Sequence, residues 1–267
     1  MESTTATHIT SQPNHETILA IRQLVKRFGG LTAVNKVDLE VRSGEVVGLV
    51  GDNGAGKSTL IKCVSGVYQA DEGEIYFEGK QAHFSRPIEA RDAGIETIYQ
   101  DLALAGNLNV SANIFLGREI KKSHIGGVVR TLDEERMLEE SERILDTLEI
   151  KIPNFREQIE KLSGGQRQAV AIARAMYWNA KLMIMDEPCN NLAVPEQRKV
   201  LDLIRKLRDQ KIPVILITHT LPDVFAVTDR IVIMHRGRKV AEKRTAETDS
   251  QQVVEYMVGV RDDTRAA

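Results

Sequence analysis

The sequence predicts an α/β protein with a mostly parallel β-sheet. Short apolar runs recur along the chain, which is typical of strands buried on both faces of a parallel sheet. Amphipathic stretches of helical period alternate with these runs, as expected when helices cover such a sheet. A glycine-rich loop also joins one apolar run to the helix that follows it.

The first hundred residues contain the clearest strand patterns. Residues 16–28 and 34–41 alternate apolar and polar positions, so each predicts a strand. Residues 44–51, GEVVGLVG, are almost wholly apolar and predict a buried strand. A helix is expected over 57–67 and a further strand over 73–79.

The middle of the chain has a different pattern. Residues 102–162 contain no convincing buried strand. Thr131 and Glu134 have the spacing of a capping box and predict a helix start. The helix that follows would carry its apolar face on Met137, Leu138, Ser141, Ile144, Leu145 and Leu148. These features predict a helical subdomain inserted into the sheet domain.

Strand patterns return in the last third of the chain. Residues 181–188 and 214–218 are two more buried runs, and a charged helical stretch, 195–210, separates them. Residues 230–242 predict a final strand pair that turns at Gly237. The last segment is short and is expected to add one helix and a frayed end.

Composition narrows the class of protein. The chain has 267 residues, 42% of them hydrophobic and 28% charged, with a formal net charge of −2. This balance gives no reason to expect nucleic acid as a partner. Cys63 and Cys189 are the two cysteines, so a reducing compartment is expected rather than a disulfide framework. No apolar run is long enough to cross a bilayer, and residues 1–16, which lack the apolar centre of a secretory signal, are expected to be a mobile tail.

The glycine-rich loop predicts a phosphate-binding site. Residues 51–58, GDNGAGKS, match the pattern G-x-x-x-x-G-K-[ST] between a predicted strand and a predicted helix. Glycines allow backbone N–H groups to surround an anion, and the helix adds the positive end of its dipole. Lys57 supplies a charge for the outer phosphates, Ser58 a ligand for Mg²⁺, and Thr59 a further donor. The candidate nucleotide-binding residues here are Gly51, Asp52, Asn53, Gly54, Ala55, Gly56, Lys57, Ser58 and Thr59.

Two other interpretations of this loop were weighed. A dinucleotide-binding fingerprint needs glycines as G-x-G-x-x-G and does not require Gly-Lys-Ser at its end. A glycine-rich turn that binds nothing is also possible, but the strand before it and the helix after it disfavour that alternative.

A buried strand carries the candidate metal and catalytic carboxylates at its end. Asp186 and Glu187 directly follow the apolar run LMIM. Asp186 is the candidate ligand for Mg²⁺, and Glu187 the candidate acceptor of a proton from an attacking water. The alternative is a solvated acidic turn, which the apolar run disfavours.

Two polar residues complete the predicted site. Gln100 lies where the strand pattern gives way to the helical segment, and it is placed on the metal, its bound water and the hinge of that segment. His219 ends a buried strand and is placed on a terminal phosphate oxygen. A lone histidine is more often structural, so its position at the end of the strand carries this assignment.

The stretch 162–176, LSGGQRQAVAIARAM, is similar to the signature of the ATP-binding cassette (ABC) ATPases. The order of all the motifs resembles that family over roughly 18–245. The resemblance implies a P-loop NTPase (RecA-like) core with an antiparallel β subdomain and an inserted α-helical subdomain. It also implies that Phe28 stacks on adenine, and that Gln100, Glu187 and His219 are catalytic residues that act on ATP and Mg²⁺.

The same resemblance sets the expected domain boundaries. A single ATPase domain covers 17–245, with its core at 17–100 and 162–245 and its helical subdomain at about 101–161. The mobile tail precedes it at 1–16, and the C-terminal helix and tail occupy 246–267.

The signature also has a physical interpretation. Ser163 is a good N-cap, and Gly164 and Gly165 leave the helix start open to an anion, with Gln166 next in the motif. The resemblance implies that two copies of the chain pack head to tail. Each signature would then close on the ATP held by the phosphate loop of the other copy.

A narrower resemblance indicates the cargo. Residues 99–119 and 221–240 are similar to the ATPases of importers for ribose, xylose, fructose and similar monosaccharides. This implies permease subunits as partners, an indirect link to a periplasmic sugar-binding protein, and a peripheral place on the cytoplasmic face of the membrane. Inositol, a nucleoside or a signalling sugar is an alternative cargo. A cassette acting on nucleic acid or ribosomes is a distant alternative, because the helical segment is short and the net charge slightly acidic.

One stretch departs from the pattern of the sugar importers. Residues 187–194 read EPCNNLAV where that class has a sequence close to EPTAALGV. Ala193 stands where many cassettes carry an aspartate that reaches across the dimer, which affects how the two ATP sites communicate. Cys189 is expected near the catalytic carboxylate, either as a small space-filling residue or as a thiol whose modification blocks turnover.

Overall fold

The computed structural model describes residues 17–124 and 129–265. Its largest sheet has six strands in the order β12-β11-β3-β10-β9-β6. The strands from β11 to β6 pair in parallel, and β12 pairs antiparallel with β11 at the edge. Their bounds are β3 Val46–Gly51, β6 Ile95–Ile98, β9 Leu182–Asp186, β10 Val214–Ile217, β11 Arg230–His235 and β12 Arg238–Arg244. The predicted α/β class with a mostly parallel sheet is confirmed.

A second sheet of four strands is antiparallel, in the order β2-β1-β4-β5. Its strands are β1 Thr17–Phe28, β2 Leu31–Arg42, β4 Glu72–Phe77 and β5 Lys80–Ala82. The apolar side chains of β1 and β2 pack with those of α1 (Lys57–Val64) in one buried cluster that also includes residues of β3 and β10. The alternation read from the sequence therefore buries one face of this sheet against the phosphate-loop helix.

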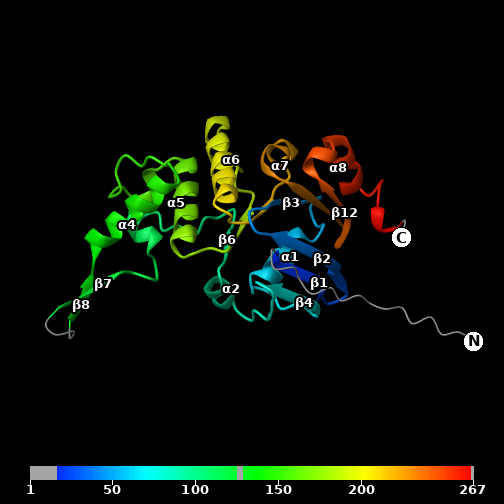
Figure 1. Cartoon of the computed structure of the whole chain (residues 1–267), viewed down its shortest axis with the longest axis horizontal. Coiled ribbons are helices and arrows are strands. Elements are labelled where there is room, and N and C mark those ends of the chain that lie inside the picture. Colours follow the sequence, from blue (N-terminus) through cyan, green and yellow to red (C-terminus); the bar gives the residue numbers. More distant parts are fainter. Residues whose placement is uncertain (1–16, 125–128, 266–267) are drawn as a thin grey trace, which may run out of the picture.

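The remaining helices are α2 Pro87–Ala93, α3 Val110–Ile114, α4 Glu134–Thr147, α5 Gly164–Tyr177, α6 Val194–Asp209, α7 Leu221–Val227 and α8 Ser250–Met257. Helices α4 and α5 lie in the half of the molecule opposite the C-terminus, and α8 lies beside that terminus (Figure 1). Single 3₁₀ turns lie at Ile159–Lys161, Thr245–Glu247 and Asp263–Arg265. Among the described residues, no helix combines the length and the apolar character needed to cross a membrane.

The segment between β6 and β9 differs from its prediction in two details. A short exposed hairpin, β7 Lys121–His124 and β8 Val129–Leu132, precedes α4, and the sequence did not indicate it. The predicted capping box of Thr131 and Glu134 is wrong, because Thr131 lies in β8. Asp133 is the N-cap instead, and its carboxylate accepts a hydrogen bond from the backbone N–H of Arg136.

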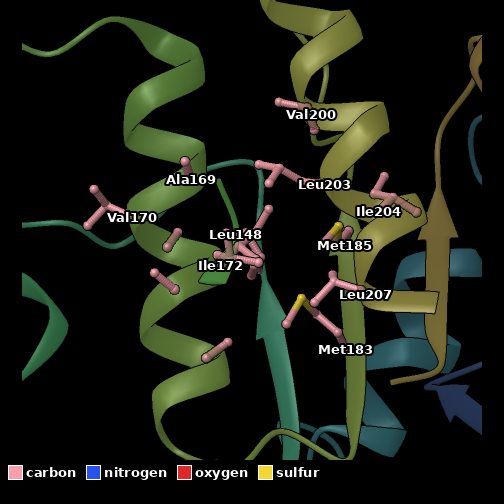
Figure 2. Close-up of a cluster of buried hydrophobic side chains, with 14 of the residues drawn as sticks. Leu148, Ala169, Val170, Ile172, Met183, Met185, Val200, Leu203, Ile204 and Leu207 are labelled. Atoms are coloured by element: carbon pink, nitrogen blue, oxygen red, sulfur yellow. The ribbon is translucent and has the colours of Figure 1, made fainter. Parts of the chain in front are cut away.

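The predicted apolar face of α4 is confirmed, and it joins the core beneath α5 and α6. Met137, Ser141 and Leu145 are its buried residues, and Leu148 follows them directly after the helix end. Figure 2 shows Leu148 between Ile172 of α5 and Leu203 and Leu207 of α6. The same cluster reaches the β9 side chains, so α5 and α6 are held against the sheet that carries the site.

We expect Leu207→Ala to lower the free energy of unfolding by about 2–5 kcal/mol, because it removes a fully buried side chain and leaves a cavity between α6 and β9. Equilibrium urea unfolding measures the change. Leu31→Ala is the matched control, since Leu31 is 66% exposed. Equal losses from the two variants would contradict the packing of α6 described here.

Candidate nucleotide-binding site

The phosphate loop is wedged between the two sheets. A Cβ at Gly56 would lie 2.4 Å from the carbonyl oxygen of Ala33 in β2, and one at Gly51 would lie 2.3 Å from that of Met234 in β11. Gly56 also has a φ of +100°, which favours glycine, and it is the N-cap of α1. The two end glycines are therefore required by sterics at the places where the motif puts them.

Lys57 closes the phosphate loop through two hydrogen bonds to its main chain. Its Nζ donates to the carbonyl oxygens of Gly51 at 2.7 Å and Asp52 at 3.1 Å. Burial lowers the pKa of Lys57, while the nearby carboxylates of Glu187 and Asp186 act in the opposite direction. The ammonium group thus lies at the centre of the predicted phosphate site, held by oxygens that a phosphate group can replace.

Phe28 is the last residue of β1 and is 43% exposed. Its ring packs edge-on against Tyr68, with the centroids 5.2 Å apart, and Lys26 Nζ lies 5.4 Å from its centroid. An exposed, braced aromatic ring of this kind is suited to stacking on a purine base, as predicted for Phe28.

The candidate catalytic carboxylate follows one strand of the sheet and is hydrogen-bonded to two residues that follow the neighbouring strand. Glu187 follows β9, and its Oε1 accepts hydrogen bonds from His219 Nδ1 at 2.8 Å and from the His219 backbone N–H at 3.1 Å. Its Oε2 accepts from the Thr218 hydroxyl at 3.1 Å. The sequence interpretation missed Thr218, although its position before His219 at the end of β10 could have indicated it. The structure therefore brings the predicted Glu187 and His219 into direct contact.

The predicted metal ligands have the donor chemistry that magnesium prefers. Ser58, Gln100 and Asp186 offer a hydroxyl, an amide and a carboxylate oxygen, and Mg²⁺ binds a few such oxygens while it keeps several waters. Asp186 is close enough to Glu187 and Lys57 for their charges to affect it: burial and Glu187 raise its pKa, and Lys57 lowers it. A cation beside Asp186 would favour its charged form.

Gln100 and the catalytic carboxylate of Glu187 line the same cavity, which has a volume of about 460 Å³. Gly164 and Asn190 line it as well. The cavity therefore lies between the start of the helical segment, the catalytic strand and the signature motif of one chain.

The signature motif packs against α6 and the loop before it. Ser163 caps α5 in a full capping box with Gln166: each side chain accepts a hydrogen bond from the backbone N–H of the other residue. A Cβ at Gly164 would lie 2.4 Å from Leu192, and one at Gly165 would lie 3.2 Å from Glu196 at the start of α6. The start of α5 thus packs closely against α6 and the loop before it, and a side chain at either glycine would displace Leu192 or Glu196.

Cys189 is buried beside the catalytic residues and is paired with Asp223 of α7. Burial, followed by the negative charge of Asp223 and a hydrogen bond to it, raises the pKa of the thiol to about 12. A thiol of this kind carries very little thiolate at neutral pH. The structure therefore favours the space-filling role of Cys189 over a reactive one.

The fold and the loop together define a P-loop nucleotide-binding ATPase. Residues 34–190 match the family model described as "ABC transporter". The chain belongs to the ABC transporter family, and the resemblance noted from its motifs is confirmed.

Curated relatives cover nearly the whole chain. It is 47% identical to the xylose/arabinose import ATP-binding protein XylG of Sulfolobus acidocaldarius over 240 residues, which are 90% of this chain and 93% of that protein. It is 45% identical to the fructose import ATP-binding protein FrcA of Rhizobium meliloti over 254 residues, 94% of this chain and 98% of that protein. The ribose import ATP-binding protein RbsA 2 of Escherichia coli O157:H7 is 38% identical, but the match covers 92% of this chain and only 47% of that protein.

Solved structures of cassettes have the same fold. The ATP-binding cassette MJ1267 of an ABC transporter superposes with a TM-score of 0.78 at 31% identity, over 91% of this chain and 99% of that one. A nucleotide-free cassette from an ABC transporter gives 0.74 at 28% identity, over 91% of this chain and 95% of that one.

We expect Gly56→Ala to weaken ATP binding about tenfold or more, because the new Cβ would collide with the Ala33 carbonyl and the loop would have to shift. Isothermal titration calorimetry measures the affinity. Gly54→Ala is the matched control: Gly54 has a φ of +80°, but a Cβ there meets nothing within 4 Å, so the loss should be smaller. The reverse order would contradict the wedged loop.

We expect Cys189 in the folded protein to react with iodoacetamide at pH 7.5 about a hundredfold or more slowly than free cysteine, because the thiol is buried and its pKa is raised. Mass spectrometry of the labelled peptide follows the reaction, and the urea-unfolded chain is the control. Rapid labelling of the folded chain would show that Cys189 is accessible and reactive.

Proposed function

We propose that this chain binds and hydrolyses ATP to drive the import of a monosaccharide through a membrane permease. The observation that carries the hydrolytic part is the carboxylate of Glu187, held by Thr218 and His219 beside the phosphate-loop lysine. The cargo class rests on the relatives, whose printed names are those of xylose/arabinose, fructose and ribose import proteins.

Residues of the phosphate loop and of two strand ends have different roles in the hydrolytic step. Lys57 and the loop amides bind the phosphate oxygens, and His219 holds Glu187 in one orientation. Glu187 then accepts a proton from the attacking water as the terminal phosphate departs. Magnesium, held by Ser58, Gln100 and Asp186, supplies positive charge to the phosphate oxygens when bound.

Two copies of the chain would complete two sites. The signature of one copy, Ser163 with Gly164 and Gly165, presents the N-terminus of a 14-residue helix, which attracts an anion. It packs on α6 of its own chain and on the loop before that helix. A two-fold arrangement places each signature on the ATP held by the other copy, with the contact made twice.

A groove between the six-stranded sheet with α2 and the helical segment with α5 offers a docking place for the permease. It has a volume of about 350 Å³ and is lined by residues of α2 and β6 on one side and by Arg118, Arg174 and Trp178 on the other. Arg174 donates to the carbonyl oxygens of Leu102 and Ala103, just after Gln100. A permease segment in this groove would thus be mechanically linked to Gln100 through Arg174.

The place of action follows from these partners. We place the chain at the cytoplasmic face of the membrane, bound peripherally to permease subunits, with a periplasmic sugar-binding protein delivering the cargo on the other side. Residues 101–161 would transmit the closing motion of the dimer to the permease. The same motor suits another small polar cargo, such as inositol or a nucleoside.

We expect Glu187→Gln to keep ATP binding and to lower ATP turnover about a hundredfold or more, because the amide is nearly isosteric but cannot accept the proton of water. A phosphate-release assay measures turnover and calorimetry measures binding. Glu139→Gln, at an exposed position of α4, is the matched control and should retain the parent rate. Turnover near the parent rate in Glu187→Gln would disprove the assigned role.

A further inference from the structure

The anion site at the start of α5 already contains a carboxylate of its own chain. Glu196, in the first turn of α6, packs against the signature glycines, since a Cβ placed on Gly165 would lie 3.2 Å from the Cβ of Glu196. The Ser163 hydroxyl, followed by the backbone N–H groups of Gly165 and Ala193, lowers the pKa of this carboxyl. The Oε2 of Glu196 would lie 3.5 Å from a Cβ placed on Gly164. The carboxylate therefore lies directly over the signature motif.

This contact uses the groups that the dimer would need. Within the chain, the Ser163 hydroxyl accepts from the Gln166 backbone N–H and faces the Glu196 carboxylate, the acceptor to which its single proton is directed. Glu196 also supplies negative charge at the N-termini of both α5 and α6, where the helix dipoles favour it. A phosphate group that approaches this helix start meets a like charge and an occupied donor.

We propose that Glu196 is an internal substitute for phosphate, which keeps the signature motif closed until the terminal phosphate of the partner's ATP displaces it. This proposal rests on the proposed dimer. The cost of displacing two such carboxylates raises the ATP concentration at which two chains associate. Association then requires a group of higher charge than a carboxylate, which a terminal phosphate bearing two negative charges provides.

The structure also offers a place for the displaced carboxylate. Glu196 lines the same cavity as Gln168 and Arg167 of α5. Gln168 is only 4% exposed, and its Nε2 has no hydrogen-bond partner among the described residues. A buried donor without a partner carries an energetic penalty, so the wall of this cavity contains an unsatisfied polar group beside the space into which the carboxylate would move.

The experiment compares dimer formation in two chains that do not hydrolyse ATP. In Glu187→Gln, sedimentation velocity gives the ATP concentration at which half of the chain is dimeric. Adding Glu196→Gln should lower this concentration about three- to tenfold, because a neutral amide competes less well with phosphate for Ser163 and Gly165. Glu196→Ala should lower it at least as much, because it removes the competing acceptor entirely.

Two further measurements separate this role from a structural one. Asp209→Asn removes the same charge at the other end of α6 and should leave the midpoint unchanged. ATP affinity measured on dilute monomers should also stay the same, since Glu196 acts on the ATP of the partner. An unchanged or higher midpoint in both Glu196 variants would overturn the proposal. Absence of ATP-dependent dimers in Glu187→Gln itself would instead refute the proposed dimer, and this inference with it.

Discussion

The site depends on one steric constraint, the close fit of the phosphate loop between the two sheets. Gly56 lies against Ala33 of the antiparallel sheet, and Gly51 lies against Met234 of the parallel sheet. Gly237, in the turn between β11 and β12, donates its N–H to the Ala55 carbonyl and accepts from the Asn35 N–H. The loop is therefore fixed by main-chain contacts on both sides, so its amides are preorganised for an anion before one binds.

Most of the fold could be predicted because its signals are local. Strands β1 to β4 and β9 to β12 and the helices α1, α4 and α6 follow from apolar runs and from periodicity, and the family motifs then set the layout. The predictions fail for short elements and where strand pairing decides the local structure. Strands β5 to β8 have three or four residues each and were not predicted, and helices α2 and α7 have seven residues each, too few for a clear period. Asp133 replaces the predicted cap because Thr131 pairs in β8 with the neighbouring strand β7, and this pairing overrides a local capping pattern.

The residues of the site also fall into those that could be predicted from the sequence and those that could not. Lys57, Glu187 and His219 could be assigned because strand ends and a loop motif fix their positions, and the register of β9 and β10 then brings the last two together. Thr218 and Glu196 were missed because nothing in their local sequence marks them as special. Each acquires its role only from packing, Thr218 against the carboxylate of Glu187 and Glu196 against the start of α5.

The loop between Glu187 and α6 explains how this chain tolerates an unusual sequence there. Asn191 has a φ of +59°, a conformation that asparagine adopts more readily than most residues. The Leu192 side chain packs on Gly164, and its carbonyl accepts a hydrogen bond from Gln197 Nε2. Backbone geometry and one apolar contact thus maintain the short path from Glu187 to Gly164 without the usual aspartate. In the proposed dimer, Glu187 and Gly164 of one chain serve different ATP molecules. This loop directly follows Glu187 in the chain and contacts Gly164 through Leu192, so it joins the two sites by a short path of one chain segment and one side-chain contact. Glu196 lies just after it, in the first turn of α6.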